Sequence, residues 1–323
     1  MLDTPTHQMP AHTSEQSAQT SLNPDKNAAE RTQRAQRAMG EAHLSAKRSV
    51  GQSRIDRLRQ QGCCKLRLPD RSTSDAPLEA VMINSSGGLT GGDRLTWRFE
   101  TADETALTLT TQACERAYRS NAGAGKVAVD LTLGAHSSLN WLPQETILFD
   151  GSALERTVSV NMAASARLLL VESLVLGREA MGEHLTQCHF RDRWTIRRDN
   201  RLIHSEALAL SKGQSKAHSK TQSQDQLIGS TDPLLGEQTL AGHLAMATVL
   251  LVSQDADRHI APLRSSLNAN EESGDLQNGA ASAWNGKLLA RLVAKDAYSL
   301  RRTLIPILEL LNDGATMPKA WSL

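Results

Sequence analysis

The chain of 323 residues has few aromatic side chains and almost no net charge. Phe, Trp and Tyr make up 3% of it, and 36 Lys and Arg against 35 Asp and Glu leave a formal charge of +1. A protein that binds nucleic acid needs a basic surplus for the phosphates and aromatic rings on which bases stack. The composition therefore argues against nucleic acid as a partner.

Long apolar runs and zinc-binding cysteine pairs are also missing. No stretch of about 18 apolar residues occurs, so no transmembrane helix is expected. Residues 1–40 contain no apolar segment of the kind found in secretory signals. The four cysteines, Cys63, Cys64, Cys114 and Cys188, include no C-x-x-C pair. These absences predict a cytoplasmic protein with reduced thiols and no membrane partner.

Composition divides the chain into four parts. Residues 1–48 are rich in Gln, Ser, Ala, Asn and Arg, and we expect a disordered tail because they offer too little apolar surface to offset the entropy of ordering. Residues 49–210 carry a β-strand pattern, and the polar segment 211–240 is expected to be a flexible loop, as is the polar run 268–281. Residues 241–323 are expected to form a small C-terminal α+β part of the same domain.

Alternation with a period of two predicts that the fold is mainly β. It is clearest at Val127, Val129, Leu131 and Leu133, and again at Val158, Val160 and Met162. Short strands separated by Gly, Asn and Asp indicate a sandwich, a barrel or a solenoid. Asp199-Asn200 and Asn285-Gly286 have the composition of hairpin turns.

The C-terminal part combines both kinds of element. Residues 246–252 predict a strand, and residues 255–267 predict a helix. A second helix is expected to start after Asp296, which can cap it, and to end near Leu311. Pro306 is expected to kink or interrupt this helix, since proline cannot donate the backbone hydrogen bond.

Two glycine-rich segments resemble phosphate-binding loops only superficially. The segment 120–126 ends in a lysine, but a phosphate loop requires glycine where Ser120 stands and a hydroxyl residue where Val127 stands. The segment 87–93 lacks the glycine order of a dinucleotide-binding loop. A turn with positive φ is the simpler interpretation of it.

His184, Cys188 and His189 have the chemistry of metal ligands. On a strand, however, His184 and Cys188 share one face, and His189 points to the other. Three scattered ligands without a fourth do not predict a structural zinc site. The usual metalloprotease and serine-hydrolase motifs are also absent.

Two carboxylates interrupt apolar strand faces. Glu172 lies on the face of Leu168, Leu170, Leu174 and Leu176, and Glu206 on the face of Leu202, Leu208 and Leu210, with His204 beside it. A buried carboxylate needs a counter-charge, water or a cation. Two interpretations stay open: an ion pair with an arginine such as Arg167 or Arg201, or an internal polar passage lined by carboxylates.

Several motifs follow one another in an order typical of one family. They are the glycine-rich string at 83–95, Tyr118-Arg119-Ser120, the strings at 141–151 and 172–178, Gly182-Glu183, and the closing segment 317–322. Together they resemble the urease accessory protein UreD family, also called UreH, over about residues 50–323. The chain departs from the family at Ser85 and Ser86, where two prolines are frequent, and at Ala117, where Phe is frequent.

The resemblance implies a two-layer β-helical body with a small α/β end and no catalytic activity. It implies a platform that joins apo-urease to UreF and to the GTPase UreG, with Ni²⁺ passing through its interior. The family positions associated with that passage correspond to Asp93, Glu172, Glu206 and Glu115. No tightly bound cofactor is implied, and hard oxygen ligands at sparse positions suit an ion in transit.

Two other functions remain open. A β-solenoid hydrolase acting on carbohydrate would place two carboxylates in an open groove lined by aromatic side chains, which the low aromatic content disfavours. A scaffold without any ion role would leave Glu172 and Glu206 paired to arginines.

Overall fold

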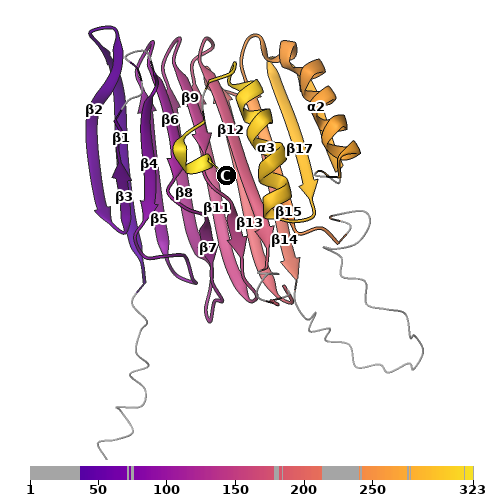
Figure 1. Ribbon diagram of the computed structural model, residues 1–323. Helices are drawn as coiled ribbons and strands as arrows, with labels where there is room; N and C mark the ends of the chain where they lie inside the picture. The colour runs from indigo at the N-terminus through magenta and orange to yellow at the C-terminus, as the bar shows by residue number, and fades with distance from the viewer. Residues whose placement is uncertain are drawn as a thin grey trace, which may run out of the picture. The chain divides into compact units, whose positions relative to one another are not determined.

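The computed structural model describes residues 37–70, 73, 76–177, 182–183, 185–212, 240, 242–274, 276, 278–315 and 317–322 (Figure 1). This part of the chain is mainly β, as predicted, and consists of two sheets and a small number of helices. None of its helices is both long and apolar enough to cross a membrane.

The first sheet has seven strands. In spatial order they are β14 (Arg201–Lys212), β13 (Cys188–Arg198), β11 (Ser152–Met162), β8 (Gly125–Leu133), β5 (Arg94–Thr101), β1 (Met39–Ser49) and β2 (Gln52–Gly62). The strands from β13 to β1 are parallel, whereas β14 and β2 close the two ends antiparallel.

The second sheet has ten strands. Eight lie in the order β16 (Asn278–Trp284), β17 (Lys287–Ala294), β15 (Ala245–Val252), β12 (Arg167–Leu176), β9 (Ser138–Leu142), β6 (Ala106–Thr111), β4 (Leu78–Asn84) and β3 (Cys64–Arg67). The short β10 (Thr146–Leu148) pairs with β12 and with β7 (Glu115–Ala117).

Apart from the short β7 and β10, the strands from β4 to β13 alternate between the two sheets. From β4 to β13 the chain passes back and forth, and each strand pairs in parallel with the strand one turn earlier. The result is a set of stacked, β-solenoid-like coils with a small C-terminal unit of strands and helices, which confirms the predicted fold class. The hairpin turns are confirmed too, since Asp199, Asn200, Asn285 and Gly286 all have positive φ.

The main core lies between the sheets. Phe99 of β5 and Trp141 of β9 come from opposite sheets, and their ring centroids are 6.1 Å apart. Glu172 lies on this inner face of β12, as predicted, because Leu168, Leu170, Leu174 and Leu176 belong to the same cluster. The neighbouring Leu169, Val171 and Val175 point the other way, into a second core.

The second core covers the outer face of the ten-stranded sheet. The helices α2 (Ile260–Glu272) and α3 (Ala297–Leu311) pack on this face, where α3 crosses near β15 and β17 (Figure 1). Asp296 caps α3 as predicted, accepting a hydrogen bond from the backbone N of Ser299 at 2.8 Å. Pro306 does not interrupt α3, which continues through it to Leu311.

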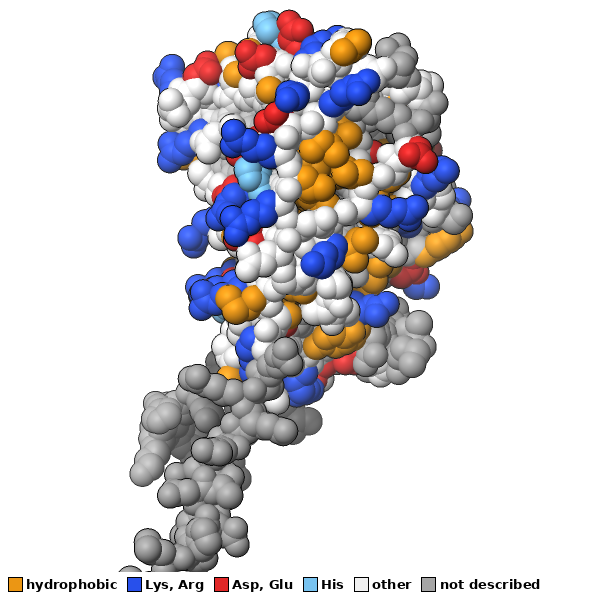
Figure 2. Space-filling model, turned by 90° about the vertical axis from the view of Figure 1, so that its left-hand side faces the viewer, with side chains coloured by type: hydrophobic (Ala, Val, Ile, Leu, Met, Phe, Trp, Pro, Cys, Tyr) orange, Lys and Arg blue, Asp and Glu red, His pale blue; other side chains and the backbone are white. Residues whose placement is uncertain are grey.

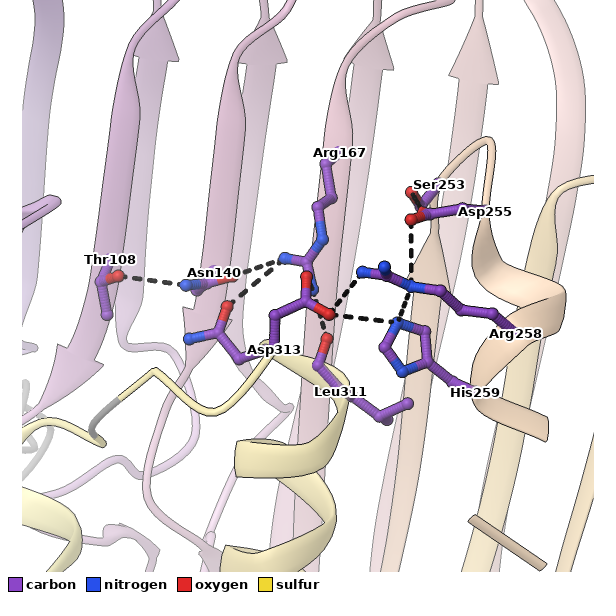
Figure 3. Close-up of polar contacts among 10 residues, drawn as sticks. Thr108, Asn140, Arg167, Ser253, Asp255, Arg258, His259, Leu311 and Asp313 are labelled. Atoms are coloured by element: carbon purple, nitrogen blue, oxygen red, sulfur yellow. Dashed lines mark hydrogen bonds and ion pairs between the residues drawn. The ribbon is translucent and has the colours of Figure 1, made fainter. Parts of the chain in front are cut away.

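The end of α3 is fixed to the sheet by a row of polar side chains (Figure 3). Arg167 of β12 donates to the backbone O of Leu311 and, at 3.5 Å, to Oδ1 of Asn140 on β9. Asp313, just past the helix, pairs with Arg258, and Nε2 of His259 lies 3.6 Å from the same carboxylate. Burial lowers the pKa of His259. Arg167 is therefore engaged on the outer face and is not the partner of Glu172, because positions 167 and 172 point to opposite faces.

The edge at β2 leaves the space between the sheets partly uncovered. Ile55 and Leu58 pair with the core residues Ala46 and Leu44 and so point to the same side, yet they are 36% and 40% exposed. Figure 2 shows this side of the molecule, where Lys and Arg side chains surround hydrophobic ones.

Some predicted boundaries were wrong. Residues 39–48, expected to belong to a disordered tail, form β1, where Ala42, Leu44 and Ala46 alternate as buried residues between β2 and β5. The expected loop at 268–281 instead contains the end of α2 and the start of β16. Residues 1–36 and 213–239, the bulk of the expected tail and loop, lie outside the described residues.

Candidate functional site: a row of carboxylates between the sheets

A cavity of about 280 Å³ lies between the two sheets. It contacts Glu115 of β7, Trp141 of β9, Arg156 of β11 and Glu172 of β12. Other lining residues are exposed at the surface, among them Gly87, Gln112, Ala113 and Arg116. The cavity therefore leads from the protein surface at the glycine-rich loop to the buried pair Arg156 and Glu172.

A second cavity, of about 20 Å³, lies on the other side of that pair. Its lining includes Arg156, Glu172 and Asp192, and also Glu206 of β14. A space of this size holds about one water molecule. Because Arg156 and Glu172 contact both cavities, their side chains form the wall between them.

Arg156 lies at the centre of a buried ionic cluster. Its guanidinium pairs with Glu172 and binds Asp192 twice, through Nε at 3.1 Å and Nη2 at 2.6 Å. Trp141 donates its indole N–H to Glu172 at 2.8 Å, and Trp194 donates to Asp192 at 3.1 Å. Two carboxylates therefore share one arginine in a region where the side chain of Glu172 is 4% exposed.

The pKa values of Glu172 and Arg156 both depart from their ordinary values in this cluster. Burial raises the pKa of Glu172 to about 7, although Arg156 opposes this shift. Burial disfavours the charge of Arg156, but Asp192 and Glu172 together hold its pKa above the ordinary value. Glu172 therefore holds a proton more readily than an ordinary carboxyl group does.

Glu115 lies at the surface end of the larger cavity. The side-chain N of Asn84 donates to both of its carboxylate oxygens at 3.2 Å. Burial raises the pKa of Glu115 to about 7, and the hydrogen bond from Asn84 only partly offsets this effect. Cys114, which is half-buried, lines the same end of the cavity.

Glu206 marks the opposite end of the row. Both of its oxygens accept from Nη2 of Arg291 on β17, at 2.6 and 2.9 Å, and Nε2 of His204 lies 3.6 Å away. The nearby imidazole of His204 lowers the pKa of Glu206, with a further contribution from Arg291. The expected inner face of β14 is correct from His204 onward, but a bulge at Ile203 turns Leu202 outward, where it is 54% exposed.

Asp93 is buried but does not line either cavity. Its two oxygens accept hydrogen bonds from the backbone N of Ala38 and of Thr90, each at 2.8 Å. It thus holds the glycine-rich loop, in which Gly87, Gly88 and Gly92 have the predicted positive φ. A Cβ at Gly88 would lie 2.3 Å from the ring of Tyr118, so only glycine fits there.

The structure also places the other residues considered from the sequence. Lys126 lies in strand β8, as predicted, with its ammonium 3.6 Å from Glu155. Cys188 is buried, and His189 lies 3.7 Å from Glu155, whereas His184 lies outside the described residues. Among the residues that the structure describes, no three His, Cys, Asp or Glu side chains gather as a metal site.

Sequence reasoning missed Arg156 and Asp192. Both interrupt apolar inner faces, Arg156 between Leu154 and Val158 and Asp192 between Phe190 and Trp194. The criterion that identified Glu172 would therefore have found them. The proposed partners Arg167 and Arg201 were wrong; the arginines that pair with Glu172 and Glu206 are Arg156 and Arg291.

This two-sheet body with an interior row of carboxylates has relatives among proteins of known name. The family model described as UreD urease accessory protein matches residues 38–322. Proteins named "Urease accessory protein UreD" from Rhizobium johnstonii and Mesorhizobium japonicum are each 43% identical, over 290 and 295 residues. They cover 90% of this chain and 97% and 95% of their own lengths. One from Agrobacterium fabrum is 41% identical over 290 residues, 90% of this chain and 93% of its own. The chain belongs to the UreD urease accessory protein family.

Proposed function

We propose that the protein is a non-enzymatic scaffold of cytoplasmic urease maturation and that Ni²⁺ passes through its interior on the way to apo-urease. Its partners are a UreF-like accessory protein, a UreG-like GTPase and the subunits of apo-urease. Family membership supports the maturation role. The observation that carries the interior route is the Arg156–Glu172 pair, which lines both cavities.

The scaffold role has support at the β2 edge. Exposed apolar side chains that form a patch mark protein interaction sites more often than isolated ones do. Ile55 and Leu58 of β2 are exposed apolar side chains, and Figure 2 shows hydrophobic side chains lying among Lys and Arg on this side of the molecule.

The carboxylates supply what a divalent cation needs between two apolar layers. A cation leaving water requires negative charge and oxygen ligands along its route. Glu115 offers these near the surface, Glu172 in the middle, and Glu206 at the far end. Arg156 balances Glu172 in the absence of the ion. Since it also binds Asp192 through two hydrogen bonds, it can keep these while Glu172 turns to the cation.

Weak binding of Ni²⁺ at each glutamate would let the ion move on to the next one. The three glutamates lie at separate positions along the row, so a bound ion meets few protein ligands at any one of them. Protons also compete with the ion at Glu115 and Glu172, because the pKa of each is about 7. An ion that enters displaces a proton and can leave again when the proton returns.

A specific observation favours one alternative. A scaffold without an ion role predicts that Glu172 and Glu206 pair with arginines, and both do. A carbohydrate hydrolase fits less well, because Glu172 is buried and already bound to Arg156 and Trp141.

A scaffold with a nickel passage and a scaffold without one predict different results when a glutamate is replaced by the uncharged glutamine. Glu172→Gln and Glu206→Gln keep size and hydrogen bonding but remove the charge that attracts Ni²⁺. A passage predicts an intact complex with the partners and less nickel in the urease produced. A purely structural role predicts weaker folding and assembly first, with normal nickel in whatever complex forms. Glu155→Gln, on the outer face of β11, is the matched control. Normal nickel loading by the double Gln variant would remove these residues from the route.

A further inference from the structure

A further pocket, of about 510 Å³, lies where two hairpin turns meet at the edge of the sheets. One turn joins β13 to β14 and the other joins β16 to β17. Arg198 links them, since its Nη2 donates to the backbone O of Asn285 at 3.3 Å. Gly286 keeps the second turn close to this guanidinium, because a Cβ there would lie 3.2 Å from Nη1 of Arg198. The pocket is thus built from ordered turns of both sheets.

Lys287 lines this pocket and is buried without a counter-charge among the described residues. The residue is 5% exposed, and its ammonium donates to the backbone O of Ile203 and lies 4.7 Å from the centroid of the Trp284 ring. It forms no ion pair with any carboxylate in the described part of the chain. A carbonyl and an aromatic face only partly replace the solvation that a buried ammonium loses. Burial, together with the nearby charge of Arg198, lowers the pKa of Lys287.

Two further cations line the same pocket. Arg198 and Arg201 lie opposite each other across the hairpin, where like charges repel. Neither forms an ion pair with a carboxylate among the residues that the structure describes. Asp199 is the one acidic residue of the lining, and its Oδ1 already accepts from the backbone N of Ala164 at 3.0 Å. The pocket is therefore lined by three cationic side chains and by one carboxylate, which already accepts a hydrogen bond from the backbone.

We propose that the pocket formed by Arg198, Arg201 and Lys287 binds a small anion that carries phosphate groups. The excess of positive charge matches a multivalent anion, and a guanidinium can hold two phosphate oxygens at once. The volume is within the range of small-ligand pockets. An anion here would give Lys287 the counter-charge that the protein does not supply. The site is separate from the carboxylate row, so it does not depend on the passage of nickel.

The test is calorimetric titration of the full-length chain with inorganic pyrophosphate, with ATP as a second arm and acetate as the monovalent control. We expect pyrophosphate to bind and acetate not to bind. Lys287→Gln keeps a donor for the O of Ile203, and Arg201→Gln changes an exposed side chain. Each should weaken pyrophosphate binding about tenfold, because a charge-assisted hydrogen bond is lost. Arg193→Gln, an exposed position of β13 outside the pocket, should leave it unchanged.

The outcomes separate the site from general attraction to positive charge. Equal binding of pyrophosphate and ATP identifies the phosphate groups as the recognised element, and tighter binding of ATP extends the ligand to a nucleotide. No binding of either at about 10 mM, a concentration at which even millimolar affinity is visible, would overturn the proposal. So would binding that Arg201→Gln, Lys287→Gln and Arg193→Gln affect equally. A thermal melt of each variant shows whether the folded state is retained, and Arg201→Gln serves if Lys287→Gln does not fold.

Discussion

Arg156 of the seven-stranded sheet and Glu172 of the ten-stranded sheet form a buried ion pair that is the wall between two interior cavities. The same pair therefore joins the two layers of the fold and lies in the middle of the row of carboxylates. The structural and functional roles of this pair can be tested separately. Stability requires that the charges of Arg156 and Glu172 balance, whereas passage of a cation requires that Glu172 can exchange Arg156 for the ion.

Loss of Arg156 should destabilise the fold strongly. Arg156→Met leaves Glu172 and Asp192 buried without their cation, and we expect a loss of about 3–5 kcal/mol in the free energy of unfolding. Arg291→Gln is the comparison, because that arginine is 55% exposed and its pair with Glu206 should contribute about 1 kcal/mol or less. Urea denaturation measures both. Equal losses for the two variants would contradict the central position of Arg156.

Glu115 should make the protein less stable as the pH rises. Its pKa increases from 4.5 to about 7 on folding, so the stabilisation is complete below about pH 4.5 and is lost as the pH rises through about 7. Since each pKa unit corresponds to 1.36 kcal/mol, the effect is about 3 kcal/mol. Glu115→Gln should remove this part of the pH dependence and be more stable than the unchanged chain at pH 8. Parallel stability curves for the two proteins from pH 5 to 8 would show that Glu115 is charged in the folded state.

Cys114 provides a probe for the surface end of the larger cavity. Cys63 and Cys114 are half-buried, whereas Cys64 and Cys188 are buried, so Cys63→Ser leaves one accessible thiol. A maleimide attached to Cys114 should obstruct the cavity and strongly reduce nickel loading of urease without releasing the partner proteins. The Cys63→Ser, Cys114→Ser variant, treated identically, is the control. Unchanged loading after complete labelling would place the entry elsewhere.

Asp93 should act through the glycine-rich loop. Asp93→Ala removes two hydrogen bonds from backbone N–H groups to a charged acceptor, and we expect a loss of about 2–4 kcal/mol in the free energy of unfolding. Nickel delivered per assembled complex should stay close to normal. A stable variant with poor nickel delivery would instead support the role in the passage that the family resemblance implies for Asp93.

Most of the fold could be predicted because its strands carry their own pattern. The alternation in β8 and β11 identified their buried faces, and in β12, which is apolar on both faces, Glu172 stood out as the interruption of one of them. β1 was missed because its inward residues include the small Ala42 and Ala46, whose burial depends on β2 and β5 on either side. The sequence of β1 alone does not show which strands will lie on either side of it.

The site could be predicted only in part for the same reason. Glu172 and Glu206 were visible as interruptions of apolar faces, but their partners come from other strands. Arg156 reaches Glu172 across the two sheets, and Arg291 reaches Glu206 from β17, which a single sequence does not show. The bulge at Ile203 likewise depends on pairing with β13, and so the outward position of Leu202 was not foreseen.

The central claim is tested most directly by replacing the polar wall with an apolar one. A triple variant, Arg156→Met, Glu172→Met and Asp192→Leu, removes the buried charges together, a change that proteins often tolerate with little loss of stability. The measurement is the nickel content of urease matured with this variant, in complexes shown by pull-down and thermal melting to be assembled and folded. The account predicts intact complexes and urease with little nickel. Fully nickel-loaded urease from the same complexes would show that the ion does not pass between the sheets.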